Sequence, residues 1–215
     1  MVNEIADGLL LASGYLSPGG QAEVVAEVRK VVAAAPLYRP VMPRFGRPFS
    51  VQMSNCGPLG WVSDKSGYRY QATHPVSGTP WPEMPEVVAK IWEDLSGYEG
   101  SAECCLINYY DDDAKMGLHR DENEEVFDAP VVSVSLGDEA LFRFGGPERK
   151  DPTKSFRLMS GDVLVMGGAS RLNFHGVDRI YPGTSNLLKD GGRLNLTLRR
   201  VTKVERAYDV KGGRR

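Results

Sequence analysis

The segment Arg193-Leu-Asn-Leu-Thr-Leu-Arg199 near the end of the chain decides the expected fold. Leucines alternate strictly with polar residues, so in an extended strand the three leucines point to one side and the four polar side chains to the other. Such a strand packs one side on a hydrophobic core while its other side lines a polar cavity. The alternative is an exposed edge strand whose arginines are solvated.

Short β-rich segments recur from Cys104 onward and are separated by Gly, Pro and Asp turns. This spacing is typical of a sandwich or barrel of strands. We expect a mainly β (α+β) protein. The segments expected to form strands are residues 131–136, 140–144, 155–158, 163–166 and 194–201.

Two amphipathic segments are expected to form helices on the outside of the sheet. In residues 21–32 the apolar positions form one helical stripe, and Ser17 followed by Pro18 suits the start of a helix. In residues 87–95 the apolar residues again share one side, and the pattern stops before Gly97.

Length and composition indicate one domain. A chain of 215 residues buries roughly two-thirds to three-quarters of its extended surface when it folds. No apolar run approaches the roughly 20 residues needed to cross a bilayer, so no membrane partner is expected. Cys104 and Cys105 are adjacent and Cys56 makes the count odd, which is a poor disulfide framework and indicates a reducing compartment. We expect a cytoplasmic monomer.

Three residues are candidate metal ligands. His119 and Asp121 would point the same way from an extended segment, and His175 lies downstream. Two imidazoles and one carboxylate can hold Fe(II) on one face and leave the opposite positions open to O2 and a cosubstrate. Zinc is the rival metal, because the same ligands describe hydrolytic zinc enzymes. The third histidine, His74, is expected in a loop.

The two arginines of the 193–199 run would need anionic partners if they face inward. Guanidinium groups at both ends of the polar row can pair with the two carboxylates of a small dicarboxylic acid through bidentate hydrogen bonds. 2-Oxoglutarate meets that requirement. Together with the candidate metal ligands, this favours an iron oxygenase.

Charge is distributed unevenly along the chain. The net charge of −2 does not suggest a polyanionic substrate, but residues 39–71 hold five basic residues against one acid, Asp64, a local charge of +4. Trp61, Tyr68 and Tyr70 lie in the same segment, which suits a surface that contacts phosphates and stacks on bases. The alternative is a solvated loop with its aromatic residues buried in the core.

A series of motifs follows in one order between about Met53 and Val201. They are Asn55-Cys-Gly-Pro-Leu-Gly-Trp61, Pro80-Trp-Pro-Glu-Met-Pro85, Cys105-Leu-Ile-Asn108-Tyr-Tyr110, His119-Arg-Asp121, Ala129-Pro-Val-Val-Ser-Val-Ser-Leu-Gly137, Phe144-Gly-Gly146, Gly161-Asp162, Gly167-Gly-Ala-Ser-Arg171, Phe174-His175-Gly176 and the run 193–199. In these motifs the chain resembles the AlkB family of Fe(II)- and 2-oxoglutarate-dependent nucleic-acid dealkylating dioxygenases, of the bacterial AlkB type.

The resemblance implies a double-stranded β-helix, or jelly roll, with flanking helices and an N-terminal nucleotide-recognition lid. All of residues 1–215 would form a single dioxygenase domain. Within it, the lid would span about 39–75 and the jelly-roll core about 104–201, and residues 206–215 are expected to form a disordered basic tail.

The resemblance also implies the roles of individual residues. Catalysis would depend on the iron ligands His119, Asp121 and His175. The 2-oxoglutarate site would comprise Asn108, Tyr110, Arg193, Asn195 and Arg199. Substrate contacts would come from Trp61, Tyr68, Tyr70, Asn123 and Arg149, with the target base held between Trp61 and His119.

The activity implied is oxidative demethylation of N-alkylated bases of the 1-methyladenine and 3-methylcytosine type, as in repair of DNA alkylation damage. It would use Fe(II), O2 and 2-oxoglutarate and release succinate, CO2 and formaldehyde. Alkylated DNA, expected to be single-stranded, would be the partner, with RNA also possible.

Two positions depart from the family pattern. Asn123 stands where an acid is expected and Met166 where an aromatic residue is expected, so the preference among damaged bases would differ. Two other functions stay open at this point. One is an Fe(II)/2-oxoglutarate hydroxylase of a small molecule or protein side chain, and the other is a metal-binding or sensor module without turnover.

Overall fold

Two antiparallel sheets dominate the computed structural model, which describes residues 2–203; the expected basic tail lies outside the described residues. The larger sheet has seven strands, in the spatial order β1 (Val2–Ala6), β2 (Leu9–Ala12), β11 (Val163–Met166), β8 (Val131–Gly137), β13 (Arg193–Arg199), β6 (Cys104–Tyr110) and β3 (Gln52–Cys56). The smaller sheet has the order β10 (Lys154–Leu158), β9 (Glu139–Phe144), β12 (His175–Tyr181) and β7 (Met116–His119).

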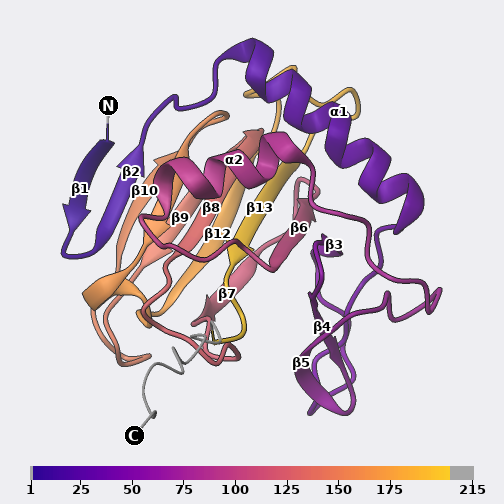
Figure 1. Cartoon of the computed structure of the whole chain (residues 1–215). Coiled ribbons are helices and arrows are strands. Elements are labelled where there is room, and N and C mark those ends of the chain that lie inside the picture. The colour runs from indigo at the N-terminus through magenta and orange to yellow at the C-terminus, as the bar shows by residue number, and fades with distance from the viewer. Residues whose placement is uncertain (1, 204–215) are drawn as a thin grey trace, which may run out of the picture.

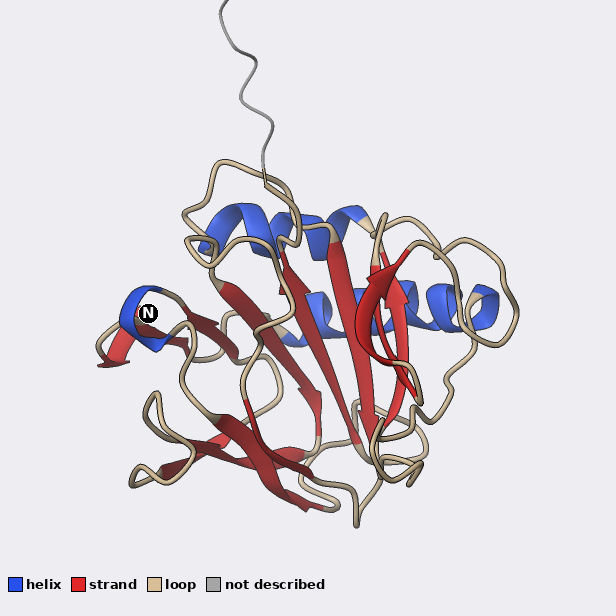
Figure 2. Ribbon diagram, turned by 90° about the horizontal axis from the view of Figure 1, so that it is seen from below, coloured by secondary structure: helices blue, strands red, loops and turns tan. Residues whose placement is uncertain are grey.

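Helices cover one face of the large sheet and the small sheet faces the other (Figures 1 and 2). Helix α1 (Pro18–Ala34) and helix α2 (Glu86–Leu95) pack on the leucine side of β13 in one hydrophobic cluster. A second cluster joins β6 and β11 to β9 and β12 between the two sheets. This arrangement is a jelly roll with flanking helices, and it confirms the expected fold class.

The central strand β13 shows the predicted alternation. Leu196 and Leu198 are fully buried against the helices, while Asn195 and Thr197 face the space between the sheets. The strand pairs with β6 on one side and β8 on the other, so the edge-strand alternative is wrong. The strand ends at Arg199, two residues before the predicted end.

Both helices begin close to the predicted residues. The Ser17 hydroxyl accepts a hydrogen bond from the Gly20 amide and caps α1, and Pro18 occupies the first turn. Helix α2 is followed by Gly97, whose positive φ of 61° suits the turn after a helix. No helix among the described residues is both long enough and apolar enough to span a membrane.

A separate hairpin of β4 (Gly60–Asp64) and β5 (Gly67–Gln71) lies beside the end of the large sheet formed by β3 (Figure 1). The side chain of Asn55 on β3 bonds the backbone of Trp61 in both directions, which fixes the hairpin to the sheet. Ser63 donates to the carbonyl oxygen of Val41, so the basic 39–49 segment packs against the same hairpin.

The cysteines and His74 have structural surroundings. All three cysteines are buried and free. Burial raises the pKa of Cys104 to about 12, so this thiol stays protonated at neutral pH. His74 lies in a loop, as predicted, and its Nδ1 accepts hydrogen bonds from the amides of Val76 and Ser77.

The contact between β7 and β12 leaves no room for a side chain at Gly176. A Cβ atom there would lie 2.5 Å from the carbonyl oxygen of Met116, whereas one at the neighbouring Gly117 would meet nothing within 4 Å. We therefore expect Gly176→Ala to lower the free energy of unfolding by about 1–3 kcal/mol, as overpacking does. Denaturant unfolding measures this change in the free energy of unfolding, with Gly117→Ala as the matched control. An equal decrease in both variants would contradict the packing argument.

Candidate metal and anion site

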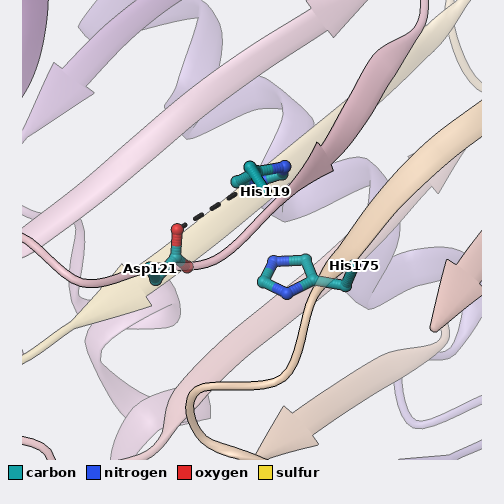
Figure 3. A group of neighbouring side chains, drawn as sticks. All are labelled: His119, Asp121 and His175. Atoms are coloured by element: carbon teal, nitrogen blue, oxygen red, sulfur yellow. Dashed lines mark ion pairs between the residues drawn. The ribbon is translucent and has the colours of Figure 1, made fainter. Parts of the chain in front are cut away.

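Three side chains converge where β7 ends and β12 begins (Figure 3). His119 and His175 are paired across the two strands, and their ring centroids are 4.6 Å apart. Asp121 follows β7, with its Oδ1 atom 3.9 Å from Nε2 of His119. One potential ligand atom from each residue lies within 4.8 Å of the other two, so the predicted convergence is confirmed.

Backbone carbonyl groups orient both imidazoles. Nδ1 of His119 lies 2.9 Å from the Gly117 carbonyl oxygen, and Nδ1 of His175 lies 3.0 Å from that of Asn173. If each Nδ1 carries the proton and donates it to the carbonyl, each Nε2 keeps its lone pair for a metal. Burial, together with neighbouring His119, lowers the pKa of His175 to about 4, which keeps this ring neutral at pH 7.

Asp121 is held by Arg199. Both Nε and Nη2 of Arg199 donate to Oδ2 of the carboxylate, at 3.0 and 2.8 Å. Burial opposes ionisation of Asp121, but the positive charge of Arg199 and the nearby imidazoles outweigh it, so the pKa of Asp121 lies below its usual value. The second oxygen, Oδ1, is the one that faces His119.

A second polar region lies at the other end of the same face of β13. The guanidinium of Arg193 is buried, and its Nη2 donates to the Ser135 hydroxyl at 3.0 Å. Among residues 2–203, its Nε and Nη1 find no hydrogen-bond acceptor, and neither does Oδ1 of nearby Asn108 find a donor. Burial lowers the pKa of Arg193 below its ordinary value. Two unpaired buried donors on a cation are costly unless an anion binds there.

The two arginines therefore differ in what they can bind. In the described part of the chain, Arg193 has two unpaired nitrogens, whereas Arg199 has one, Nη1, because Asp121 and Glu124 engage its other nitrogens. The sequence predicted that guanidinium groups at both ends of the polar row pair with the two carboxylates of one dicarboxylic acid. Within residues 2–203 the structure gives Arg193 no carboxylate partner, whereas Asp121 and Glu124 share Arg199.

One cavity of about 260 Å³ connects these features. Its lining includes all three candidate metal ligands and most of the other predicted site residues. The latter are Asn108, Tyr110, Asn195, Arg199, Trp61, Tyr68, Asn123 and Arg149. Arg193 and Tyr70 are not part of the lining; Arg193 lies beneath Tyr110, with its guanidinium carbon 5.4 Å from the centre of that ring.

Aromatic side chains of the hairpin form one wall of the cavity. Trp61 stacks on Tyr68, with ring centroids 5.5 Å apart and an interplanar angle of 19°. Nε1 of Trp61 donates to Oδ1 of Asn123 at 3.3 Å. Arg149 comes from the loop between β9 and β10 and donates to the carbonyl oxygen of Leu118. Met166 is a buried residue of the lining.

Sequence reasoning missed two buried charged residues beside this cavity, Glu124 and Arg171. Their side chains are 1% and 3% exposed, and they form an ion pair at 3.3 Å. Glu124 lies in the acidic stretch 121–125, where sequence alone gives no sign that one member is buried. Arg171 was part of a recognised motif without a predicted role.

The donor set fits an iron ion with a dicarboxylate beside it. Two imidazoles and a carboxylate on one side of a cavity are the usual ligands of non-haem Fe(II) in oxygenases. The unpaired nitrogens of Arg193 suit a carboxylate bound further along the same strand. Both fits follow from atoms of this chain.

Comparisons with known proteins agree with this geometry. Residues 8–199 match the model of the 2OG-Fe(II) oxygenase superfamily, which decides between iron and zinc. A protein of Caulobacter vibrioides named "Alpha-ketoglutarate-dependent dioxygenase AlkB homolog" is 48% identical over 199 residues, covering 92% of this chain and 89% of the relative. "Alpha-ketoglutarate-dependent dioxygenase AlkB" of Escherichia coli strain K12 is 40% identical over 187 residues, covering 85% and 86%.

A solved structure described as that of OsALKBH1 is similar as well, with a TM-score of 0.81 and 34% sequence identity. The match covers 93% of this chain and all of that one. The family model matches residues 8–199, and the matches to the two bacterial relatives cover most of this chain and of each relative. The chain therefore belongs to the AlkB family of α-ketoglutarate-dependent dioxygenases, within the 2OG-Fe(II) oxygenase superfamily.

Proposed function

We propose that this enzyme demethylates N-alkylated bases of nucleic acids, 1-methyladenine and 3-methylcytosine among them, and so repairs alkylation damage in DNA. RNA is a second substrate under this proposal. The observation that carries it is that one cavity is lined both by the three candidate metal ligands and by aromatic side chains of the β4–β5 hairpin, which belongs to the basic segment 39–71. The bacterial AlkB relatives support the same activity.

His119, Asp121 and His175 would hold the Fe(II). When bound with 2-oxoglutarate and O2, the metal supplies the oxidation of the methyl group, with succinate, CO2 and formaldehyde as products. The chain itself positions the ligands and encloses the reacting groups. Phe142, stacked on His175 with centroids 5.9 Å apart, contributes an apolar wall.

The cosubstrate would lie along the polar face of β13. Arg193 would bind its distal carboxylate, since its Nε and Nη1 are unpaired. Asn108, Tyr110 and Asn195 would contact the remaining oxygens, and the free Nη1 of Arg199 would approach the end of the cosubstrate near the metal. A bidentate Arg–carboxylate pair also fixes the orientation of the bound acid.

The hairpin and its basic surroundings, residues 39–75, would act as the lid over the base. Trp61 would stack on the extruded base, with His119 toward its other face, because a base must leave its stack to reach the metal. Tyr68 and Arg149 would border the opening, and Asn123 would contact the base edge. Asn can donate as well as accept a hydrogen bond, so its selectivity differs from that of an acid.

Under this proposal the enzyme acts on single strands as a monomer in the cytoplasm. Single strands are preferred because extrusion of an unpaired base costs less than extrusion from a duplex. The three free thiols fit a reducing compartment. Binding depends on a local basic segment in a chain of net charge −2, so it should weaken as salt rises.

The proposal is tested with single-stranded oligonucleotides that contain 1-methyladenine or 3-methylcytosine. We expect equal amounts of formaldehyde and succinate from the wild-type enzyme and neither product from His119→Ala. Trp61→Ala should retain activity but raise the KM for the oligonucleotide about 5- to 150-fold, because base–aromatic stacking contributes about 1–3 kcal/mol.

An unmethylated oligonucleotide of the same sequence is the control substrate and should release no formaldehyde. Lack of turnover on every methylated oligonucleotide, with 2-oxoglutarate still bound, would contradict base dealkylation. That outcome would favour hydroxylation of a small molecule or protein side chain.

Replacement of the buried cation tests the cosubstrate site. We expect Arg193→Gln to raise the KM for 2-oxoglutarate at least 30-fold, since loss of one partner of a buried charge pair costs about 2–5 kcal/mol. The wild-type melting temperature should rise when 2-oxoglutarate is added, and this increase should vanish in Arg193→Gln. Arg179→Gln, at an exposed position of β12, is the matched control. A wild-type KM for 2-oxoglutarate in Arg193→Gln would show that Arg193 does not bind the cosubstrate.

A further inference from the structure

Glu124 is a buried carboxylate that does not touch the cavity formed by the described residues. Its side chain is 1% exposed, and it is not part of the cavity lining. It accepts hydrogen bonds from Tyr70 and from Arg171, and its Oε1 lies 3.5 Å from Nε of Arg199. A buried acid with three partners has a role other than direct contact with a base in the cavity.

The two arginines that hold Glu124 also hold Asp121. Arg199 donates twice to the carboxylate of Asp121, and Nη1 of Arg171 donates to its backbone carbonyl at 2.8 Å. Two cations and two carboxylates thus form one buried group. Removal of the charge of Glu124 would leave Arg171 without a carboxylate partner among residues 2–203 and Arg199 with Asp121 alone.

Tyr70 connects this group to the hairpin. It pairs directly with Trp61 across β4 and β5, and its hydroxyl donates to Glu124. Trp61 in turn donates to Asn123, the residue before Glu124. The segment 121–124 is therefore attached to the hairpin at two points, while its first residue is a candidate metal ligand.

We propose that Glu124 is a positioning residue that couples the β4–β5 hairpin to Asp121, so that metal binding and the order of the hairpin depend on each other. The proposal rests on the metal role of Asp121 given above. Coupling between two sites is reciprocal. If an ordered hairpin raises the metal affinity at Asp121, a bound metal stabilises the ordered hairpin by the same free energy. Glu124 acts through Arg171 and Arg199 and touches neither metal nor substrate.

The test measures Co(II) binding to the full chain in the presence of 2-oxoglutarate and without any oligonucleotide. Visible absorption gives both the Kd and the spectrum of the metal site. We expect Glu124→Gln to weaken Co(II) binding at least tenfold and to alter the spectrum. Glu125→Gln, the exposed neighbour, should match the wild-type protein in both.

Hydrogen exchange of residues 60–71 is the second readout. Co(II) should slow exchange there in the wild-type protein and in Glu125→Gln, and it should have no such effect in Glu124→Gln. Tyr70→Phe keeps the charge of Glu124 but removes the hydroxyl, so it should reduce the metal-dependent protection. By reciprocity its Co(II) affinity should fall as well, but by less than in Glu124→Gln, because Arg171 and Arg199 keep their carboxylate partner. Tyr70→Phe also serves if Glu124→Gln does not fold.

Wild-type Co(II) affinity and spectrum in Glu124→Gln, whatever its melting temperature, would overturn the coupling and leave a stabilising role. The same metal-dependent protection in Tyr70→Phe as in the wild-type protein would also overturn it. Failure of the wild-type chain to bind Co(II) would overturn the metal site and this proposal together. Failure to dealkylate oligonucleotides bears only on the proposed function, because this test contains none.

Discussion

Burial of two guanidinium groups on one face of β13 is the constraint on which the site depends. A charge taken out of water is costly unless an opposite charge and further hydrogen bonds compensate it. Arg199 is compensated within the chain by Asp121 and Glu124. Arg193 lies on the same face of the same strand with only the Ser135 hydroxyl as acceptor among the described residues. Because of that difference, Arg199 belongs to a buried ion-pair cluster, whereas Arg193 is a candidate anion-binding group.

The two-sided character of β13 also determines the layers of the fold. Its leucine side requires a hydrophobic cover, which α1 and α2 supply, and its polar side requires a wall that admits a ligand, which β9, β12 and β7 supply. The pairing of His119 with His175 then places both imidazoles opposite the end of β13 that carries Arg199. The register of a few strands thus sets the positions of the candidate metal ligands and of the candidate anion site.

The secondary structure that the sequence predicted depends on local periodicity, whereas the convergence of His175 with His119 and Asp121 was predicted from the chemistry of metal ligands. The alternation at 193–199, the stripes of α1 and α2 and the cap at Ser17 can each be read from fewer than 20 residues. The pairing of Arg199 with Asp121 joins residues 78 apart, and the bond from Tyr70 to Glu124 joins residues 54 apart. Such contacts have no signature in the spacing of residues, so the unequal arginines and the buried Glu124 were not predicted. The resemblance named Tyr70 but could not indicate that its hydroxyl points to an acid and not into the cavity.

In the β4–β5 hairpin, the alternation of side chains gives the two faces different surroundings. Residues 68 and 70 of β5 and Trp61 of β4 share one face, because Tyr70 lies opposite Trp61 and side chains alternate along each strand. The other face carries Val62, which is buried with Trp81 and Ala35 in a small core of its own. One face therefore attaches the hairpin to the protein while the other presents aromatic rings to the cavity. Tyr70 lies on the same face of the hairpin as Trp61 and Tyr68, and its hydroxyl donates to Glu124. The aromatic wall against which a base would stack is therefore fixed by the same buried ion pairs that bind Asp121.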